Sequence, residues 1–182
     1  HHLTMLEGLI AAGKPEQAAA YIRKVQSDIE TITPRRYCEN ELVSLLCSSF
    51  AEKAQHAGAR LDVDARLPQA LDISDAELCA VLSNALENAL HAVAALPEKE
   101  RTVSLYCAVR LGKLLIEVKN PYAGELTLSP DGRPVTARKG HGYGCQSIQT
   151  IAARSGGLCE FKASCGTFCL QIVLPLKAAV PV

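Results

Sequence analysis

Two short segments of this chain carry residue types that together can hold a nucleotide and a metal ion. The first, Asn84-Ala85-Leu86-Glu87-Asn88-Ala89, contains two carboxamides and a carboxylate. The second, Gly140-His141-Gly142-Tyr143-Gly144-Cys145, is a glycine-rich run further along the chain. An Asn carbonyl oxygen is a hard ligand suited to Mg²⁺, and a glycine run can turn successive backbone N–H groups toward one anion. The two segments together predict a Mg-nucleotide site.

The first segment lies on a helix that we expect to begin at about Ser74 and to end before Pro97. At 100° per residue, one side of this helix gathers four polar residues, which are Asn84, Glu87, Asn88 and His91. Neither Lys nor Arg is among them, and Asn is a poor helix former. We interpret Asn88 and Asn84 as metal or phosphate ligands. Glu87 is a candidate general base, and His91 is a candidate hydrogen-bond donor to phosphate. An ordinary polar helix face is the alternative.

The glycine run stands directly before an amphipathic stretch, residues 143–154, that predicts a helix. The start of a helix carries a partial positive charge, so the backbone at Gly142 and Gly144 can cradle phosphates. Arg138 and Lys139 lie directly upstream and can neutralise the outer phosphates. A lid hinge without a ligand is the alternative interpretation. Neither segment alone is specific for a nucleotide site. The presence of both in one chain makes this interpretation stronger.

The composition of the chain narrows the class of function. The 182 residues have 19 basic and 19 acidic side chains and only 4% aromatic residues, which argues against nucleic-acid binding. No apolar run approaches the roughly 20 residues of a membrane span. The eight cysteines include no CxxC pair and lie mostly in apolar stretches. We therefore expect buried, reduced thiols in a reducing cytoplasm, rather than the disulfide framework of a secreted protein.

Residues 1–33 predict a helical hairpin. Apolar residues at helical spacing precede a break at Gly13-Lys14-Pro15, and a second apolar seam follows, made of Ile22, Val25, Ile29 and Ile32. A narrow seam of this kind is typical of helices that pair with a partner. The alternative is that both helices cap the main core.

Residues 34–182 predict an α+β domain. A helix over residues 42–57, ended by Gly58, precedes an alternating strand over residues 61–67. The spacing of Ser74 and Glu77 predicts a capping box at the start of the next helix. Alternating strands follow at residues 103–109 and 114–118, then an irregular stretch over residues 120–139, and two strands close the chain. We expect a two-layer α/β sandwich with a mixed sheet and helices on one face.

The joint pattern resembles the ATP-binding catalytic domain of sensor histidine kinases, in the GHKL superfamily shared with DNA gyrase, over nearly the whole chain. Asn84 to Ala89 resembles the asparagine box of that family, with Asn88 at the Mg²⁺-ligand position. Gly140 to Ile148 resembles its glycine box. Gly166-Thr167-Phe168 resembles a terminal element in which the Thr lies near adenine. The chain is most similar to the Agr-like, quorum-sensing branch.

The resemblance implies an ATP- and Mg²⁺-dependent histidine kinase. The γ-phosphoryl group would pass to a histidine of a dimerisation helix and then to the receiver domain of a response regulator. Glu87 would polarise the incoming imidazole, and Asn84 would support the metal ligand. Tyr143 would belong to the nucleotide-binding loop. The hairpin over residues 1–33 resembles the end of a dimerisation and phosphotransfer module, which implies a homodimer. The chain would be a cytoplasmic part of a sensor anchored in the membrane through an upstream region.

The sequence departs from the family pattern at three points, and the first of them leaves a rival open. Asn120 stands where the family has an Asp that accepts a hydrogen bond from the adenine amino group, although the Asn carbonyl oxygen can accept the same bond. The lid lacks the usual phenylalanine box, and Cys145 replaces a common Leu. The rival is a catalytically silent binding or scaffold module, or an anti-sigma-like regulator. A gyrase-like ATPase is disfavoured, because that branch has Glu where Asn84 stands.

The phosphoacceptor is not assigned. His1-His2-Leu3 resembles an element that follows the acceptor in the family, which implies an acceptor upstream of His1. A tag remnant is the other origin that we consider for His1 and His2.

Overall fold

The computed structural model describes residues 2–32, 35–124, 126, 129, 134 and 143–176. The chain divides into two compact units, His1–Arg35 and Arg36–Val182. None of the described helices is long and apolar enough to cross a bilayer.

The N-terminal unit is a helical hairpin, as the sequence predicts. Helix α1 spans His2–Ala11 and contacts α2, which spans Pro15–Ile32. The turn between them uses Gly13, whose φ of 68° is easy for glycine alone. The hairpin leaves large apolar side chains exposed, notably Leu3 at 76% and Ile10 at 65%. The pairing of these helices with a partner, which the sequence suggests, stays a prediction.

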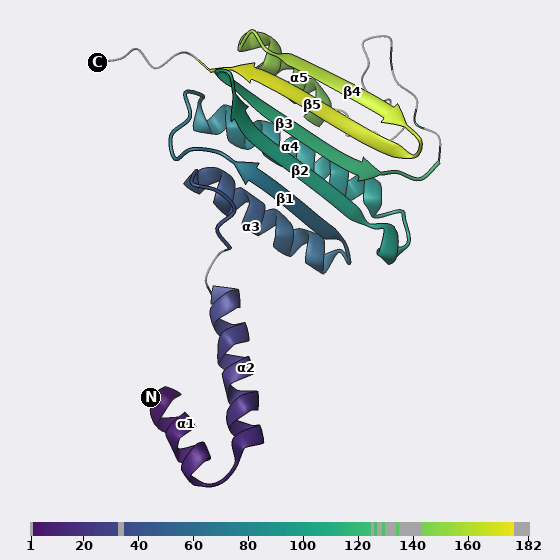
Figure 1. Ribbon diagram of the computed structural model, residues 1–182. Helices are drawn as coiled ribbons and strands as arrows, with labels where there is room; N and C mark the ends of the chain where they lie inside the picture. Colours follow the sequence, from purple (N-terminus) through teal and green to yellow (C-terminus); the bar gives the residue numbers. More distant parts are fainter. Residues whose placement is uncertain are drawn as a thin grey trace, which may run out of the picture. The chain divides into compact units, whose positions relative to one another are not determined.

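The second unit is a two-layer sandwich, and this confirms the predicted fold class. Its sheet has five strands in the order β1-β2-β3-β5-β4, which are β1 (Arg60–Arg66), β2 (Thr102–Arg110), β3 (Lys113–Pro121), β4 (Leu158–Ser164) and β5 (Thr167–Pro175). Only the β1–β2 pair is parallel among the pairs described. One face of the sheet is covered by α3 (Glu41–His56), α4 (Asp75–Val93) and α5 (Tyr143–Arg154) (Figure 1). A short 3-10 turn, Glu98–Glu100, joins α4 to β2.

Local signals at the helix ends explain where α3 and α4 begin and end. Asn40 caps α3, because its Oδ1 accepts a hydrogen bond from the backbone N–H of Val43 at 3.0 Å. Gly58 follows the last turn of α3 with a φ of 63°. The capping box predicted for Ser74 and Glu77 is wrong, because Ser74 occupies the N-cap position but makes no side-chain cap hydrogen bond. The acidic first turn of α4 supplies favourable charge at that helix end instead.

A single hydrophobic cluster fills the space between the helices and the inner face of the sheet. Its largest fully buried members come from α4 and the central strands, and include Leu78, Leu82, Leu86, Leu105, Ile116, Ile172 and Leu174. The alternation in the strands and the 3.6-residue period of α4 both point these side chains inward. This packing fixes α4 across the middle of the sheet, with contacts to β2 and β3.

All eight cysteines are free thiols. Burial raises the pKa of Cys47 and of Cys159 to about 12, so both stay protonated and unreactive near neutral pH. The expectation of buried thiols holds for Cys47, Cys107 and Cys145 only. Four others are half-buried, namely Cys38, Cys79, Cys159 and Cys169, and Cys165 is exposed. Cys165 lies with Gly166 in the two-residue turn between β4 and β5, where both residues have the positive φ values, 49° and 74°, that such hairpin turns require.

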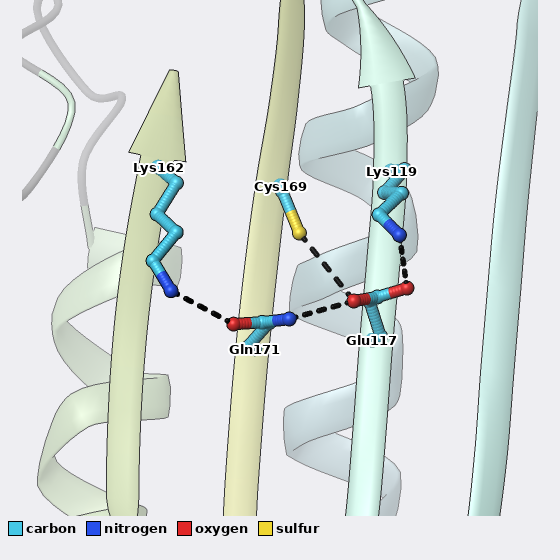
Figure 2. Close-up of polar contacts among 5 residues, drawn as sticks. All are labelled: Glu117, Lys119, Lys162, Cys169 and Gln171. Carbon is cyan, nitrogen blue, oxygen red and sulfur yellow. Dashed lines mark hydrogen bonds and ion pairs between the residues drawn. The ribbon is translucent and has the colours of Figure 1, made fainter. Parts of the chain in front are cut away.

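The uncovered face of the sheet carries a polar network across three strands (Figure 2). Gln171 of β5 donates from Nε2 to Oε2 of Glu117 on β3 at 2.7 Å. Its Oε1 accepts a hydrogen bond from Nζ of Lys162 on β4 at 3.2 Å. Lys119 forms an ion pair with Glu117, and the Cys169 thiol donates to the same carboxylate at 3.8 Å. These cross-strand pairs keep the uncovered face hydrophilic.

Truncation of the core tests the packing of α4. The side chain of Leu82 is 0% exposed, so Leu82→Ala should lower the free energy of unfolding by about 2–5 kcal/mol through lost burial and a residual cavity. Leu45→Ala on α3 is the matched control, because Leu45 is 59% exposed and should cost less than about 1 kcal/mol. Urea denaturation measures both. Equal losses would contradict this description of the core.

The network around Glu117 predicts a pH dependence of stability. Burial alone would raise the pKa of Glu117, but hydrogen bonds from Lys119 and Gln171 outweigh it and hold the pKa below the ordinary 4.5. Such a carboxyl stabilises the fold above its unfolded-state pKa, and the contribution is lost as pH falls through the folded-state value. The urea midpoint of the wild type should therefore fall more steeply below about pH 5 than that of Glu117→Gln. If the urea midpoints of the two proteins fell in parallel with pH, this role of Glu117 would be contradicted.

Candidate functional site

The start of α5 lies directly against the polar side of α4. A Cβ atom on Gly144 would lie 3.0 Å from Nδ2 of Asn88 and 3.3 Å from Oδ1 of both Asn88 and Asn84. Contacts this short leave no room for a larger side chain unless the carboxamides move. Glycine therefore lets the backbone approach the carboxamides here without displacing them. The two segments that the sequence singled out meet at this point.

Cys145 makes the next contact between the two helices. Nδ2 of Asn88 donates a hydrogen bond to Sγ of Cys145 at 3.5 Å. Cys145 is 8% exposed and Asn88 is half-buried, so water has limited access to this contact. The first turn of α5 thus touches the Asn88 carboxamide from two sides, through Gly144 and through Cys145.

A cavity of about 260 Å³ opens beside these contacts, between α4 and the strands β3, β4 and β5. Its walls are mostly apolar and include Ala89, Leu170, and the rings of Phe161 and Phe168, whose centroids lie 6.1 Å apart at 23°. Asn88, His91 and Asn120 add polar groups. An apolar cavity with a few polar groups is the usual form of a small-molecule site.

Asn120 ends the inner row of β3 and faces the cavity. It is 3% exposed, and its Nδ2 donates to the backbone carbonyl of Pro121 at 2.9 Å. This bond occupies the amide nitrogen and does not involve Oδ1. The backbone beyond it is tied to the β4–β5 turn, because the N–H of Tyr122 donates to the carbonyl of Gly166 at 3.1 Å. The end of β3 and this turn are therefore held together at the cavity.

Glu87 and Thr167 are not among the described residues that line the cavity. Glu87 is exposed and pairs with Lys53 of α3, with Nζ and Oε1 3.5 Å apart. Thr167 is exposed at the start of β5, opposite Pro121 in the strand register. Its neighbour Phe168 lines the cavity instead. His91 is exposed and lines the cavity from α4.

Several predicted site residues fall outside the described part of the chain. These are Arg138, Lys139, Gly142 and the side chain of Tyr143. Conversely, the sequence analysis did not anticipate Tyr122, Phe161 or Phe168 as lining residues. The inward alternation of β4 and β5 is the signal that could have found the two phenylalanines, because it points both toward the helices.

Among the described residues, no group of three or more His, Cys, Asp or Glu side chains could hold a metal ion. A cation at the asparagine pair would therefore rely on carboxamide oxygens and on ligands from a second molecule or water. This arrangement suits a hard ion such as Mg²⁺, which usually takes few protein ligands and shares the rest with phosphates and water.

Comparisons with known proteins agree with this fold, and one of them spans both the asparagine segment and the start of α5. A sequence profile described as GHKL domain matches residues 73–175, more than half of the chain. Among solved structures, full-length ShkA in complex with AMPPNP is 19% identical with a TM-score of 0.58, over 77% of this chain and 30% of that chain. The catalytic domain of histidine kinase ThkA is 18% identical with a TM-score of 0.59, over 74% of this chain and 90% of that chain. No curated protein sequence matches.

A wider match is to Acinetobacter baumannii histidine kinase AdeS, which is 11% identical with a TM-score of 0.52, over 97% of this chain and 95% of that chain. At these identities the structures show the fold alone. The chain spans about a third of full-length ShkA. The Agr-like branch stays a prediction. The profile spans α4 to β5, with both segments and the strands between them, and the fold is that of histidine kinase catalytic domains, so the chain belongs to the GHKL domain family.

Proposed function

We propose that this chain binds ATP with Mg²⁺ and transfers the γ-phosphoryl group to a histidine of a dimerisation helix, as a sensor kinase of a two-component system does. The observation that carries the proposal is the approach of Gly144 to the carboxamides of Asn84 and Asn88 beside a mostly apolar cavity. Full-length ShkA, which shares the fold, was solved with AMPPNP bound, and this supports a nucleotide as the ligand.

The cavity would hold the adenine base. Asn120 lines the cavity and uses one N–H of its amide on Pro121, and its carbonyl oxygen would accept a hydrogen bond from the exocyclic amino group. The flat side chains of Phe161 and Phe168 offer apolar surface to a purine. Thr167 would contact the base from the exposed start of β5.

The phosphates and the metal would lie where α4 and α5 meet. Oδ1 of Asn88 would bind Mg²⁺, and Asn84 would support it or contact a phosphate. His91 would donate to a phosphate from the next turn of α4. The backbone at Gly142 and Gly144, with Tyr143 between them and Arg138 and Lys139 upstream, would complete the phosphate cradle. Bound Mg²⁺ would neutralise charge on the phosphates during transfer.

Glu87 would polarise the incoming imidazole of the acceptor histidine. Its exposure on the side of α4 next to α3 makes it accessible to a helix from outside this domain. The ion pair with Lys53 is solvent-exposed, and pairs of this kind are worth little, so Glu87 can exchange this partner for an imidazole at small cost.

The partners follow from the same proposal. The exposed apolar side chains of the N-terminal hairpin, such as Leu3 and Ile22, would pair with a second copy in a homodimer. The phosphoryl group would pass to a receiver domain of a response regulator. The chain would act as a cytoplasmic part of a membrane-anchored sensor, of the Agr-like, quorum-sensing type.

Asn120 in place of the family's Asp favours a second candidate, a catalytically silent GHKL module that serves as a scaffold or an anti-sigma-like regulator. An Asn carries no charge, so it binds an amino group less strongly than a carboxylate does. A nucleotide titration separates the two candidates, because the scaffold does not need Mg²⁺-dependent binding.

The proposal predicts the effect of Asn88→Ala on nucleotide affinity. Calorimetric titration of the wild type with AMPPNP should show saturable binding that Mg²⁺ strengthens. Asn88→Ala should weaken binding in Mg²⁺ by about 10- to 100-fold, as expected for loss of one charge-assisted contact. Gln55→Ala, which removes an exposed carboxamide of α3, is the matched control and should leave affinity unchanged.

Near-normal Mg²⁺-dependent affinity in Asn88→Ala would refute the metal assignment. A wild type that binds no AMPPNP would refute the kinase proposal and favour the scaffold.

A further inference from the structure

Asn120 and Pro121 end strand β3 beside the cavity, and they carry complementary hydrogen-bonding groups. Nδ2 of Asn120 donates to the backbone carbonyl of Pro121 at 2.9 Å. A backbone carbonyl oxygen can only accept hydrogen bonds, so it can hold the amide nitrogen of Asn120 but not its oxygen. The contact therefore selects one of the two orientations of this carboxamide, the one with Nδ2 toward Pro121.

The Pro121 carbonyl is available for this bond because it lies outside the hydrogen-bonded ladders of β3. On the β5 side, the N–H of Tyr122 donates to the carbonyl of Gly166. Bonded and non-bonded positions alternate along antiparallel strands, so the Pro121 carbonyl points away from β5. On the β2 side, the described pairs with β3 end at Lys119. Pro121 has no N–H of its own, so this position offers the Asn120 side chain an acceptor and no donor.

Oδ1 of Asn120 is open to the cavity. The described residues provide no hydrogen bond to this oxygen, although Asn120 as a whole is only 3% exposed. Among the described residues, no fully buried side-chain oxygen or nitrogen lacks a partner, so Oδ1 reaches open space. The cavity is the space that Asn120 lines. An unused acceptor on a buried side chain at an apolar cavity suits a ligand that donates a hydrogen bond.

A carboxylate at position 120 would not fit these groups. An ionised Asp has acceptors only, so one of its oxygens would face the Pro121 carbonyl oxygen with no hydrogen between them. Burial adds to the cost, because a charge that is removed from water without a partner is destabilised. Among the described residues that line the cavity, His91 alone can carry a positive charge, and it comes from α4.

We propose that Asn120 and Pro121 act together as the adenine-reading unit of this chain. The Pro121 carbonyl holds the carboxamide with Oδ1 toward the cavity, and it excludes the carboxylate that the family usually has at position 120. Pro121 is thus a positioning residue, because its carbonyl acts through Asn120. The proposal rests on the proposed function, since the 6-amino group of an adenine nucleotide is the donor to Oδ1. Asn120 is then matched to its backbone neighbour and is not a weakened form of Asp.

The exclusion of a carboxylate is tested in the free protein, by thermal unfolding of the full chain near neutral pH. Asn120→Asp should lower Tm by about 4 °C or more. Gln55→Glu adds the same charge at an exposed position of α3 and should change Tm by less than about 2 °C. Pro121→Gly frees the backbone, so in this background the carbonyl can turn away from the new carboxylate. Asn120→Asp should then cost at most about half as many degrees.

The reading of adenine is tested by calorimetric titration with AMPPNP and with its analogue that has hydrogen in place of the 6-amino group, both with Mg²⁺. The wild type should bind AMPPNP about 3- to 10-fold more tightly than the analogue, as expected for one hydrogen bond. Asn120→Asp should reduce this ratio to less than about twofold, and the double variant with Pro121→Gly should raise it again to about threefold. A merely structural effect would weaken both nucleotides equally and leave the ratio unchanged.

Three results would overturn the proposal. One is an Asn120→Asp variant that prefers the 6-amino group as strongly as the wild type or more strongly, since the carboxylate would then be the better acceptor. Another is an equal loss of Tm from Asn120→Asp in the wild-type and Pro121→Gly backgrounds, because burial alone would explain it. The third is a wild type that binds both nucleotides equally. If the wild type binds neither, the proposed function fails, while the melts of the free protein still decide whether Pro121 excludes a carboxylate.

Discussion

The close approach of α5 to α4 at Gly144 is the constraint on which the rest of the site depends. Both asparagines lie within 3.3 Å of the position that a Cβ would occupy there, so a side chain at this position would force the carboxamides to shift. The buried cluster between α4 and the sheet fixes one partner of this contact, and the packing of α5 on α4 and β4 fixes the other. A change that moves either helix would separate the groups that we propose to bind metal and phosphate.

The same contact explains why α4 carries residues that do not favour a helix. Two interior Asn cost roughly 1 kcal/mol together relative to Ala. Both are half-buried, and Asn88 lines the mostly apolar cavity. The two Asn side chains add little to the packing of the core, since Ala85 and Ala89 fill the neighbouring buried positions of α4. A binding role for the carboxamides accounts for this local cost. The polar network on the far face of the sheet serves solubility and cross-strand pairing, and it leaves the inner face free for the site.

Periodicity was sufficient to predict the sandwich, because each strand alternates and α4 has one apolar face. The two motifs that the sequence analysis paired also lie together, since Gly144 approaches Asn84 and Asn88, while their role in binding stays a prediction. Periodicity failed where a neighbour decides the outcome. A helical wheel groups Glu87 with the asparagines, but Glu87 pairs with Lys53 of another helix and is not among the described residues that line the cavity. Tyr122 and Phe161 come together only through the strand order, and the Cys145 contact needs the register of two helices.

The measurement that tests the central claim most directly follows three groups during one titration of the wild type with AMPPNP and Mg²⁺. These are the backbone amide of Gly144 and the side-chain amides of Asn88 and Asn120, recorded by NMR. The account predicts that all three shift along one saturation curve, and that the Asn88 shift requires Mg²⁺. Shifts that saturate at different concentrations, or that leave Asn88 and Gly144 unaffected, would contradict the claim that these segments form one Mg-nucleotide site.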